Sequence, residues 1–191
     1  MFEQFKQIGR DIFLRGLISS HAGNMSARVM DRIYITRKSS MLGRLQQKDV
    51  IELKLGQDNV QAPMASSELV VHTAIYHNTS ALAIVHVHPP YATLLSMLRD
   101  EIIPVDVEGR YLFTKIPVVT PDQAIGSDES ARLVSERLKD YKIVLIRGHG
   151  SFAKGETLEE AFMYTTSLES TSFFLWNLQF VNKKNTISAK H

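Results

Sequence analysis

Residues 83–90 read AIVHVHPP and predict a buried strand that ends at a proline pair. A short apolar run is typical of a core strand, and Pro89 and Pro90 cannot continue its ladder of hydrogen bonds. Side chains at positions i and i+2 of a strand point to the same face, so His86 and His88 are expected to lie side by side. Such a pair can bind one metal ion, or it can be two half-buried polar side chains with protein partners. Further ligands are needed before the pair indicates a site.

The composition is that of an ordinary globular domain. The 191 residues are 44% hydrophobic and 22% charged, with a net charge of +2, which argues against disorder and against a dedicated nucleic-acid surface. Because there is no cysteine, a transition-metal site has to use His, Asp or Glu. No apolar stretch approaches the ~18 residues of a membrane span. We expect a single domain over 1–191 with a loose tail over 182–191, in the cytoplasm and without nucleic-acid or membrane partners.

Hydrophobic periodicity indicates an α/β layered domain around a mixed sheet. Helices are predicted over 2–18, 68–77, 91–98, 128–139 and 158–180. Strands are predicted over 33–36, 50–53, 81–87, 104–107, 116–119 and 142–146, resuming at 152–153, and a loop is predicted over 21–28. Ser66 or Ser67 is the expected N-cap of the helix over 68–77, and Ser127 that of the helix over 128–139.

A third histidine, His149, lies between Gly148 and Gly150 just after the strand over 142–146. Flanking glycines allow the backbone to bring an imidazole close to another element. By itself such a residue is more often a turn histidine that faces solvent. Together with the pair at 86 and 88 it makes three histidines, which is one standard ligand set of an open catalytic zinc site.

Two further groups of residues are suited to binding an anion or moving a proton. Glu68 falls in the first turn of a helix, where free N–H groups and the helix dipole stabilise negative charge, although a glutamate there is commonplace. Asn24 and the RKSS loop over 37–40 carry amides, hydroxyls and cations, which bind phosphate where loops converge. Each loop taken singly is an ordinary polar loop.

Five motifs follow one another along the chain: AGNMS (22–26), IT (35–36) with its polar loop, SSE (66–68), HVH (86–88) and GHG (148–150). In this order they resemble the class II aldolase/adducin family over about 5–178, most nearly its zinc-dependent fuculose-1-phosphate aldolases. The resemblance implies a central mixed, mainly antiparallel sheet flanked by helices. It also implies one Zn²⁺ per subunit, a homotetramer, and reversible cleavage of a small ketose 1-phosphate to dihydroxyacetone phosphate and an aldehyde.

The resemblance also implies roles for individual residues. His86, His88 and His149 would be the zinc ligands and Glu68 the catalytic acid/base. The implied phosphate-binding residues are Asn24, Lys38, Ser39, Ser66 and Ser67. The chain departs from the family pattern at places that bear on the substrate. The family has threonine at His21, and it has ThrGly at Lys38 and Ser39, which here lie beside Arg37. The fuculose enzyme's tyrosine acid is replaced near Glu108, with Tyr111 close by.

Other activities remain open on the same residues. Relatives with this metal triad dehydrate methylthioribulose 1-phosphate or epimerise pentulose phosphates, and SSE rather than SSD at 66–68 disfavours the epimerases. A non-catalytic binding or assembly module stabilised by zinc is the alternative of a different class. Structural zinc sites normally have four protein ligands, whereas three firm ones are found here.

Overall fold

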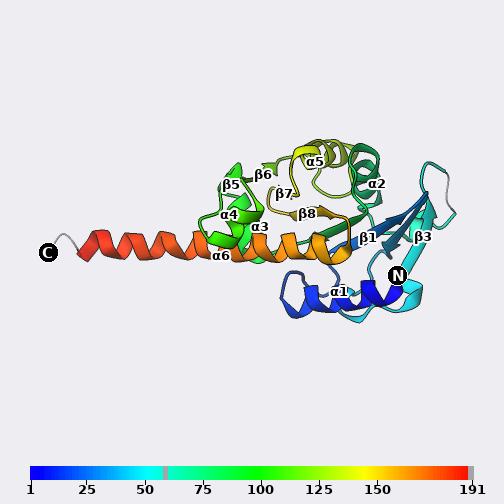
Figure 1. The fold of residues 1–191 in the computed structure, drawn as a ribbon, viewed down its shortest axis with the longest axis horizontal. Helices are drawn as coiled ribbons and strands as arrows, with labels where there is room; N and C mark the ends of the chain where they lie inside the picture. Colours follow the sequence, from blue (N-terminus) through cyan, green and yellow to red (C-terminus); the bar gives the residue numbers. More distant parts are fainter. Residues whose placement is uncertain (58–59, 189–191) are drawn as a thin grey trace.

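The computed structural model describes the backbone of residues 1–57 and 60–188, and side chains in these ranges as far as Val181. Its eight-stranded sheet has the order β3-β2-β1-β4-β8-β7-β6-β5, and of the described pairings that between β6 and β7 alone is parallel. Helices α2 and α5 cover one face of the sheet, and α1 and α6 lie on the other (Figure 1). The predicted α/β fold around a mixed, mainly antiparallel sheet is therefore confirmed.

The strands are β1 (Asn24–Val29), β2 (Arg32–Thr36), β3 (Val50–Lys54), β4 (Ala83–Val87), β5 (Glu101–Ile102), β6 (Ile116–Val119), β7 (Ile143–Ile146) and β8 (Gly150–Gly155). The α-helices are α1 (Phe2–Leu14), α2 (Leu69–Asn78), α3 (Pro90–Ser96), α4 (Val107–Leu112), α5 (Asp128–Asp140) and α6 (Leu158–Ser188). Three short 3₁₀ turns are η1 (Leu42–Arg44), η2 (Gln47–Asp49) and η3 (Ala62–Met64).

Strand β4 lies inside the sheet and is buried along its whole length. Val85 and Val87 pack in the core on the α1 and α6 side, whereas Ile84 packs in the core on the α2 and α5 side. Since side chains alternate along a strand, His86 shares the α2 and α5 face with Ile84. The predicted strand ends at Val87, as the proline pair requires, and α3 begins at Pro90.

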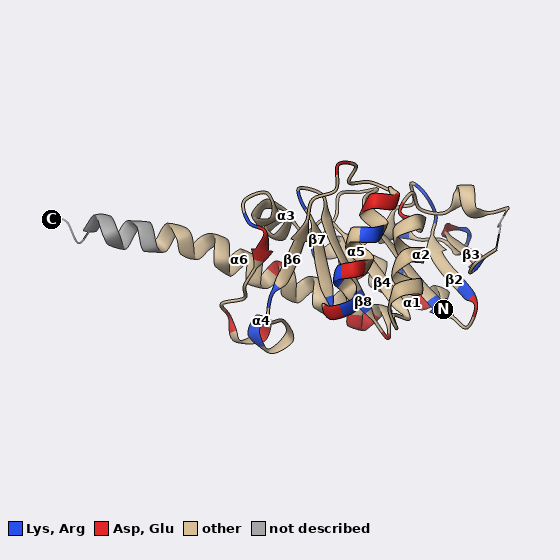
Figure 2. Cartoon of the chain, turned by 90° about the horizontal axis from the view of Figure 1, so that it is seen from above, with Lys and Arg blue, Asp and Glu red and all other residues tan. Residues whose placement is uncertain are grey.

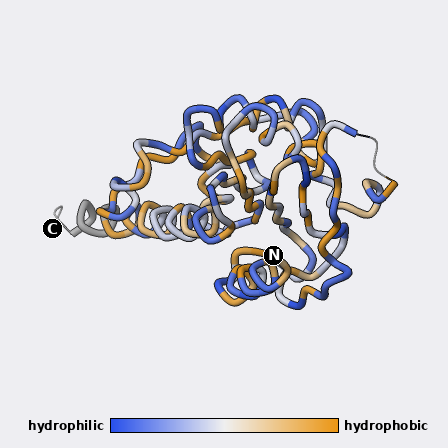
Figure 3. The backbone as a smooth tube through the Cα atoms, turned by 45° about the vertical axis from the view of Figure 1, so that its right-hand side comes forward, coloured by the Kyte–Doolittle hydropathy of each residue, from blue (hydrophilic) through white to orange (hydrophobic). Residues whose placement is uncertain are grey.

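The helices and strands carry charged residues of both signs (Figure 2). Hydrophilic and hydrophobic residues alternate along the outer helices in Figure 3, as expected of helices with one face on a sheet. Basic and acidic residues are interspersed along the elements in Figure 2. Among the described helices, including the 31-residue α6, none combines the length and apolar character that crossing a membrane needs.

The predicted loop over 21–28 is wrong, because most of it forms β1, which pairs with β2 and β4. The alternation of apolar and polar residues that predicts a strand is interrupted here, because the inward-facing Asn24 and Ser26 are polar although their side chains are buried. Both bond to the buried His72, so polar side chains occupy positions where an apolar residue would be expected.

The predicted strand over 104–107 is also wrong. The structure has the short β5 at Glu101–Ile102, and helix α4 begins at Val107. Asp106 is the N-cap of α4 and accepts a hydrogen bond from Gly109 N at 2.8 Å, which ends any extended segment there.

The end of α1 and the start of α2 differ from prediction. Helix α1 ends at Leu14 rather than at 18, because Gly16 takes φ +68° in a left-handed C-terminal turn. The N-cap of α2 is Glu68, not Ser66 or Ser67, and Ser66 Oγ instead accepts from Glu68 N at 3.2 Å. Ser127 is the N-cap of α5, as predicted.

The final helix continues past the predicted end at 180 as far as Ser188. The loose tail predicted over 182–191 therefore overlaps α6 in part, and residues 189–191 lie outside the described residues.

Candidate metal centre

His86 is fixed in position by strand β8 on one side. Its ring is buried and stacks on Phe152 with the ring centroids 4.0 Å apart. Nδ1 donates to the carbonyl oxygen of Ser151 at 3.0 Å, which leaves Nε2 with a free lone pair. Burial, together with the neighbouring histidines, holds the pKa of His86 well below its usual range. The ring is therefore a neutral ligand with a preset orientation.

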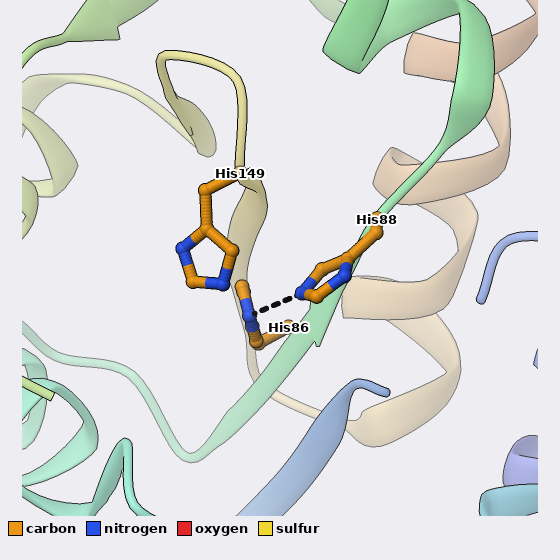
Figure 4. Close-up of side chains that lie close together, drawn as sticks. All are labelled: His86, His88 and His149. Carbon is orange, nitrogen blue, oxygen red and sulfur yellow. Dashed lines mark hydrogen bonds between the residues drawn. The ribbon is translucent and has the colours of Figure 1, made fainter. Parts of the chain in front are cut away.

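His88 follows β4 directly and points to the same side as His86 (Figure 4). The two Nε2 atoms are 3.1 Å apart, close to the ~3.3 Å expected of two nitrogens that bind one ion tetrahedrally at the usual metal–nitrogen length. Burial, and then the proximity of His149, lower the pKa of His88 to about 4. Both imidazoles are thus neutral at physiological pH.

His149 comes to the pair from the turn between β7 and β8, and this turn depends on glycine. Gly148 has φ +66°, a conformation that other residues rarely adopt. A Cβ on Gly150 would clash with the Val87 carbonyl oxygen and would lie 2.6 Å from Cδ2 of His88. Only glycine therefore allows β8 to approach the end of β4 this closely.

The three imidazoles converge although His149 lies 61 positions after His88 in the chain. Their ring centroids are 4.7 to 4.9 Å apart, and their candidate ligand nitrogens all lie within 4.8 Å of one another. Figure 4 shows the rings meeting at one point. The structure thus brings together the three predicted ligands.

Glu68 lies against this cluster and is almost fully buried. Its Oε2 accepts from Gly126 N at 3.1 Å, while Oε1 lies 4.0 Å from His149 Nε2 and has no hydrogen-bond partner among the described residues. Burial raises the pKa of Glu68 to about 7 against the opposing effect of the Gly126 N–H, and burial lowers the pKa of His149. In each residue desolvation outweighs the opposing backbone hydrogen bond, so burial favours the neutral form of both side chains.

Gly126 is a residue of the site that the sequence did not reveal. It has φ +59°, and a Cβ there would lie 2.5 Å from the Ser67 carbonyl oxygen. The glycine lets the loop before α5 reach the start of α2, where it donates to Glu68. A glycine followed by an N-cap serine indicates a turn, but no sequence signal connects it to residue 68.

The predicted phosphate-binding loops also converge. Asn24 pairs with His86 across the β1–β4 ladder, and Met25 N donates to Thr36 Oγ1 at 3.1 Å. Ser66 N donates to the Thr36 carbonyl oxygen at 3.0 Å, so the 66–67 segment lies beside the end of β2.

The RKSS loop lies next to this segment. Lys38 N donates to the Met64 carbonyl oxygen at 2.9 Å, and Arg37 forms a β-bridge with Ala65. Ser39 has φ +61°, a glycine-like conformation at a position where the resembled family has glycine. The segments expected to bind phosphate thus lie next to one another, with Asn24 beside His86, and their roles remain predictions.

Four further residues at or beside the departures from the family pattern have other neighbours. His21 is exposed and contacts Ser20 Oγ at 3.0 Å, and Arg37 Nη2 donates to Met64 Sδ at 3.5 Å. Glu108 accepts from Ser167 Oγ at 2.6 Å, while Tyr111 is 86% exposed. No described contact connects these four to the histidine cluster or to Glu68, so their involvement in the site remains a prediction.

The donor set fits a divalent transition metal. Three imidazoles, one with its tautomer fixed by a backbone carbonyl, are ligands that such ions prefer, and three protein ligands are the usual number at a catalytic zinc site. The unpartnered Oε1 of Glu68 is the one carboxylate oxygen that faces the cluster among the described contacts.

Residues 3–173 match the family model described as the class II aldolase and adducin N-terminal domain. The chain is 32% identical over 168 residues to L-fuculose phosphate aldolase of Methanocaldococcus jannaschii, which covers 87% of this chain and 91% of that one. It is 33% identical to 3-oxo-tetronate 4-phosphate decarboxylase of Haemophilus influenzae, with coverages of 93% and 87%. It is 34% identical to methylthioribulose-1-phosphate dehydratase of Gluconobacter oxydans, with coverages of 90% and 88%.

A similar solved structure is that of L-fuculose-1-phosphate aldolase from Thermus thermophilus. It superposes with a TM-score of 0.92 at 35% sequence identity, and the match covers 95% of each chain.

Proposed function

Because this chain belongs to the class II aldolase and adducin family, we propose that it is a zinc-dependent aldolase that reversibly cleaves a small ketose 1-phosphate, similar to fuculose 1-phosphate. The products would be dihydroxyacetone phosphate and an aldehyde. The observation that carries the proposal is the protonatable Glu68 carboxyl group, unpartnered on one oxygen, 4.0 Å from the nearest of three converging histidines.

His86, His88 and His149 would hold the ion. Bound there, Zn²⁺ would supply Lewis-acid stabilisation of the negative charge that develops on substrate oxygens when the carbon–carbon bond breaks. The hydrogen bond from His86 Nδ1 to the Ser151 carbonyl oxygen leaves Nε2 as the nitrogen that would bind the ion.

Glu68 would move the proton on the reacting carbon of dihydroxyacetone phosphate. In cleavage its carboxylic acid gives the proton to that carbon, and in condensation its carboxylate removes it. A pKa of about 7 suits both directions, because acid and base forms are then both populated near neutral pH. Gly126 N holds Oε2, so Oε1 is the oxygen directed at the reaction.

The converging loops would hold the phosphate away from the reacting carbon. Asn24, Ser66 and Ser67 can donate hydrogen bonds, and Lys38 and Ser39 add a cation and a hydroxyl beside them. Fixing this end of the substrate would direct the reacting carbon to Glu68.

The second candidate is decarboxylation or dehydration of a sugar phosphate on the same residues. It is favoured by the relatives named for those activities, which match this chain as well as the aldolases do. Arg37 and Lys38, where the family pattern has an uncharged loop, would suit a substrate with an additional negative charge. A pentulose-phosphate epimerase and a non-catalytic zinc-stabilised module remain alternatives outside these two.

One experiment separates these functions. Metal content is measured by elemental analysis on the purified protein, which is then incubated with fuculose 1-phosphate, methylthioribulose 1-phosphate, ribulose 5-phosphate and 3-oxo-tetronate 4-phosphate. Triose phosphate released from the first supports the aldolase. If fuculose 1-phosphate releases no triose phosphate, loss of water from methylthioribulose 1-phosphate or epimerisation of ribulose 5-phosphate replaces the aldolase with the corresponding alternative. Release of carbon dioxide from 3-oxo-tetronate 4-phosphate, which itself leaves dihydroxyacetone phosphate, replaces it with the decarboxylase. Bound zinc without turnover of any of the four supports the module.

We propose in addition a homotetramer located in the cytoplasm. Support for assembly comes from exposed apolar side chains on the later turns of α6, which leave the body of the molecule in Figure 1. These are Phe173, Phe174, Leu178 and Phe180. Light scattering on the eluting peak of a size-exclusion column tests the tetramer, and cell fractionation tests the location.

A further inference from the structure

His72 is a fully buried side chain of α2 that none of the steps above uses. Its Nε2 lies 2.6 Å from Asn24 Oδ1, and its Nδ1 lies 2.6 Å from Ser26 Oγ. Ser26 Oγ in turn lies 2.8 Å from the hydroxyl of Tyr76, one helical turn further along α2. A continuous chain of hydrogen bonds therefore runs from the core to Asn24, which neighbours His86 across the sheet.

The direction of this chain follows from the chemistry of its members. Burial lowers the pKa of His72 to about 3, so the ring is neutral and carries one N–H. An amide oxygen only accepts, so Nε2 donates to Asn24 Oδ1 and Nδ1 accepts the Ser26 hydroxyl proton. Ser26 oxygen then accepts from the Tyr76 hydroxyl, and each donor has an acceptor.

This chain of hydrogen bonds determines which end of the Asn24 amide is free. With Oδ1 held by His72, the amide nitrogen is left as the free end of the side chain, and no described residue accepts a hydrogen bond from it. Asn24 pairs directly with His86 in the β1–β4 ladder, so both side chains lie on the same face of the sheet.

We propose that His72 is a positioning residue, which fixes the Asn24 amide through its Nε2–H bond so that the Asn24 N–H₂ group donates to an anionic oxygen of the substrate. The identity of that oxygen as phosphate rests on the proposed function, whereas the orientation of the amide does not. If the chain ran in reverse, Asn24 would present its carbonyl oxygen and would select a hydroxyl donor instead.

The first test is the protonation pattern of His72 in the zinc-loaded protein. Nitrogen-15 chemical shifts distinguish a protonated from an unprotonated ring nitrogen, and the His72→Phe spectrum assigns the signals. We expect a proton on Nε2 and none on Nδ1. A proton on Nδ1 overturns the proposal, because Nε2 would then have to accept from the Asn24 amide.

The second test measures binding of dihydroxyacetone phosphate to the wild type, His72→Phe, Asn24→Ala and the double variant. His72→Phe keeps a ring against Phe152, and His77→Phe on the exposed side of α2 is its control. We expect His72→Phe to weaken binding about 10-fold with zinc content unchanged, and to have no further effect once Asn24 is alanine. Equal losses in both backgrounds would show that His72 acts only through packing and would overturn the proposal.

Ser26→Ala provides a milder variant in case the buried ring cannot be replaced. It removes the hydroxyl that fixes the tautomer, so the His72 ring should populate both tautomers and binding should weaken in the same direction. A single unchanged tautomer with unchanged binding contradicts the proposed chain. Failure to cleave any ketose phosphate would overturn the aldolase assignment alone, since the tautomer is measured without turnover.

Discussion

Oε1 of Glu68 lies 4.0 Å from Nε2 of His149, yet burial shifts the pKa of each residue toward its neutral form. At this distance an exposed pair would be a salt bridge. Here the loss of hydration on burial has the larger effect on the pKa of both groups. It leaves, beside the three histidines, a carboxyl group that exchanges its proton near neutral pH.

Replacing Glu68 with glutamine should preserve metal binding and abolish proton transfer. The amide keeps the shape of the side chain but cannot accept a proton, so exchange of the hydroxymethyl proton of dihydroxyacetone phosphate with deuterated water should fall by about 10²–10⁴-fold. Exchange is followed by NMR, with zinc content measured on the same sample. Wild-type exchange rates in Glu68→Gln would remove Glu68 from the base role.

The same variant should change how stability depends on pH in the metal-free protein. The folded pKa of about 7 lies above the ordinary value of 4.5, so between these values the unfolded state binds fewer protons and stability falls as pH rises. The penalty from Glu68 is absent below pH 4.5 and approaches about 3 kcal/mol above pH 7. Urea unfolding at pH 4.5 and at pH 7.5 should therefore show Glu68→Gln gaining stability relative to wild type as pH rises. A constant difference contradicts the raised pKa.

Replacing His88 with alanine should remove stoichiometric zinc. The two remaining imidazoles make an incomplete site, and the loss of affinity should exceed the 10–100-fold that loss of an outer hydrogen-bond partner costs. Elemental analysis after dialysis against a weak chelator measures it, with His77→Ala, an exposed histidine on α2, as control. Tight metal retained by His88→Ala would be incompatible with the triad.

Replacing Gly150 with alanine should damage both stability and the metal site. The added Cβ would meet the Val87 carbonyl oxygen and the His88 ring, neither of which can move freely. We expect a loss of about 3 kcal/mol and release of zinc. Gly56→Ala is the control, because it also adds a Cβ but has open space around it, and its left-handed φ should cost about 1–2 kcal/mol without loss of zinc. Denaturant unfolding measures the stability of each variant, and elemental analysis measures its zinc content. A Gly150→Ala variant that keeps its full zinc content would count against the close approach of β8 and β4.

Ser39 should tolerate glycine better than alanine. Its φ of +61° is strained for any residue with a Cβ, so Ser39→Gly should be more stable than Ser39→Ala by about 1 kcal/mol. At Ser40, which lies outside the left-handed region, alanine should be the more stable of the two. Chemical denaturation of the four variants measures both differences, and the same order at both positions would contradict the left-handed conformation of Ser39.

Local chemistry made much of the framework readable from the sequence. The strand at β4 was predictable because apolar side chains and two prolines define where a buried strand runs and stops, and the i, i+2 spacing places His86 and His88 on one face. The N-cap at Ser127 follows from the same kind of local rule. The absence of cysteine likewise restricts the ligands of a transition-metal site to His, Asp and Glu.

Only the tertiary structure decided which distant segments come into contact. Convergence of His149 on the pair requires Gly150 to lie against β4, and the raised pKa of Glu68 requires burial that outweighs the N–H of Gly126. Strand β1 was hidden because its inward side chains are polar and are satisfied by His72, from another element. The periodic spacing of apolar residues reports only on residues one helical turn or one strand repeat apart. Desolvation and hydrogen bonding of buried groups depend instead on which distant segments pack together. The sequence therefore specified the chemical groups and their local faces, and packing determined which of them meet and in which protonation state.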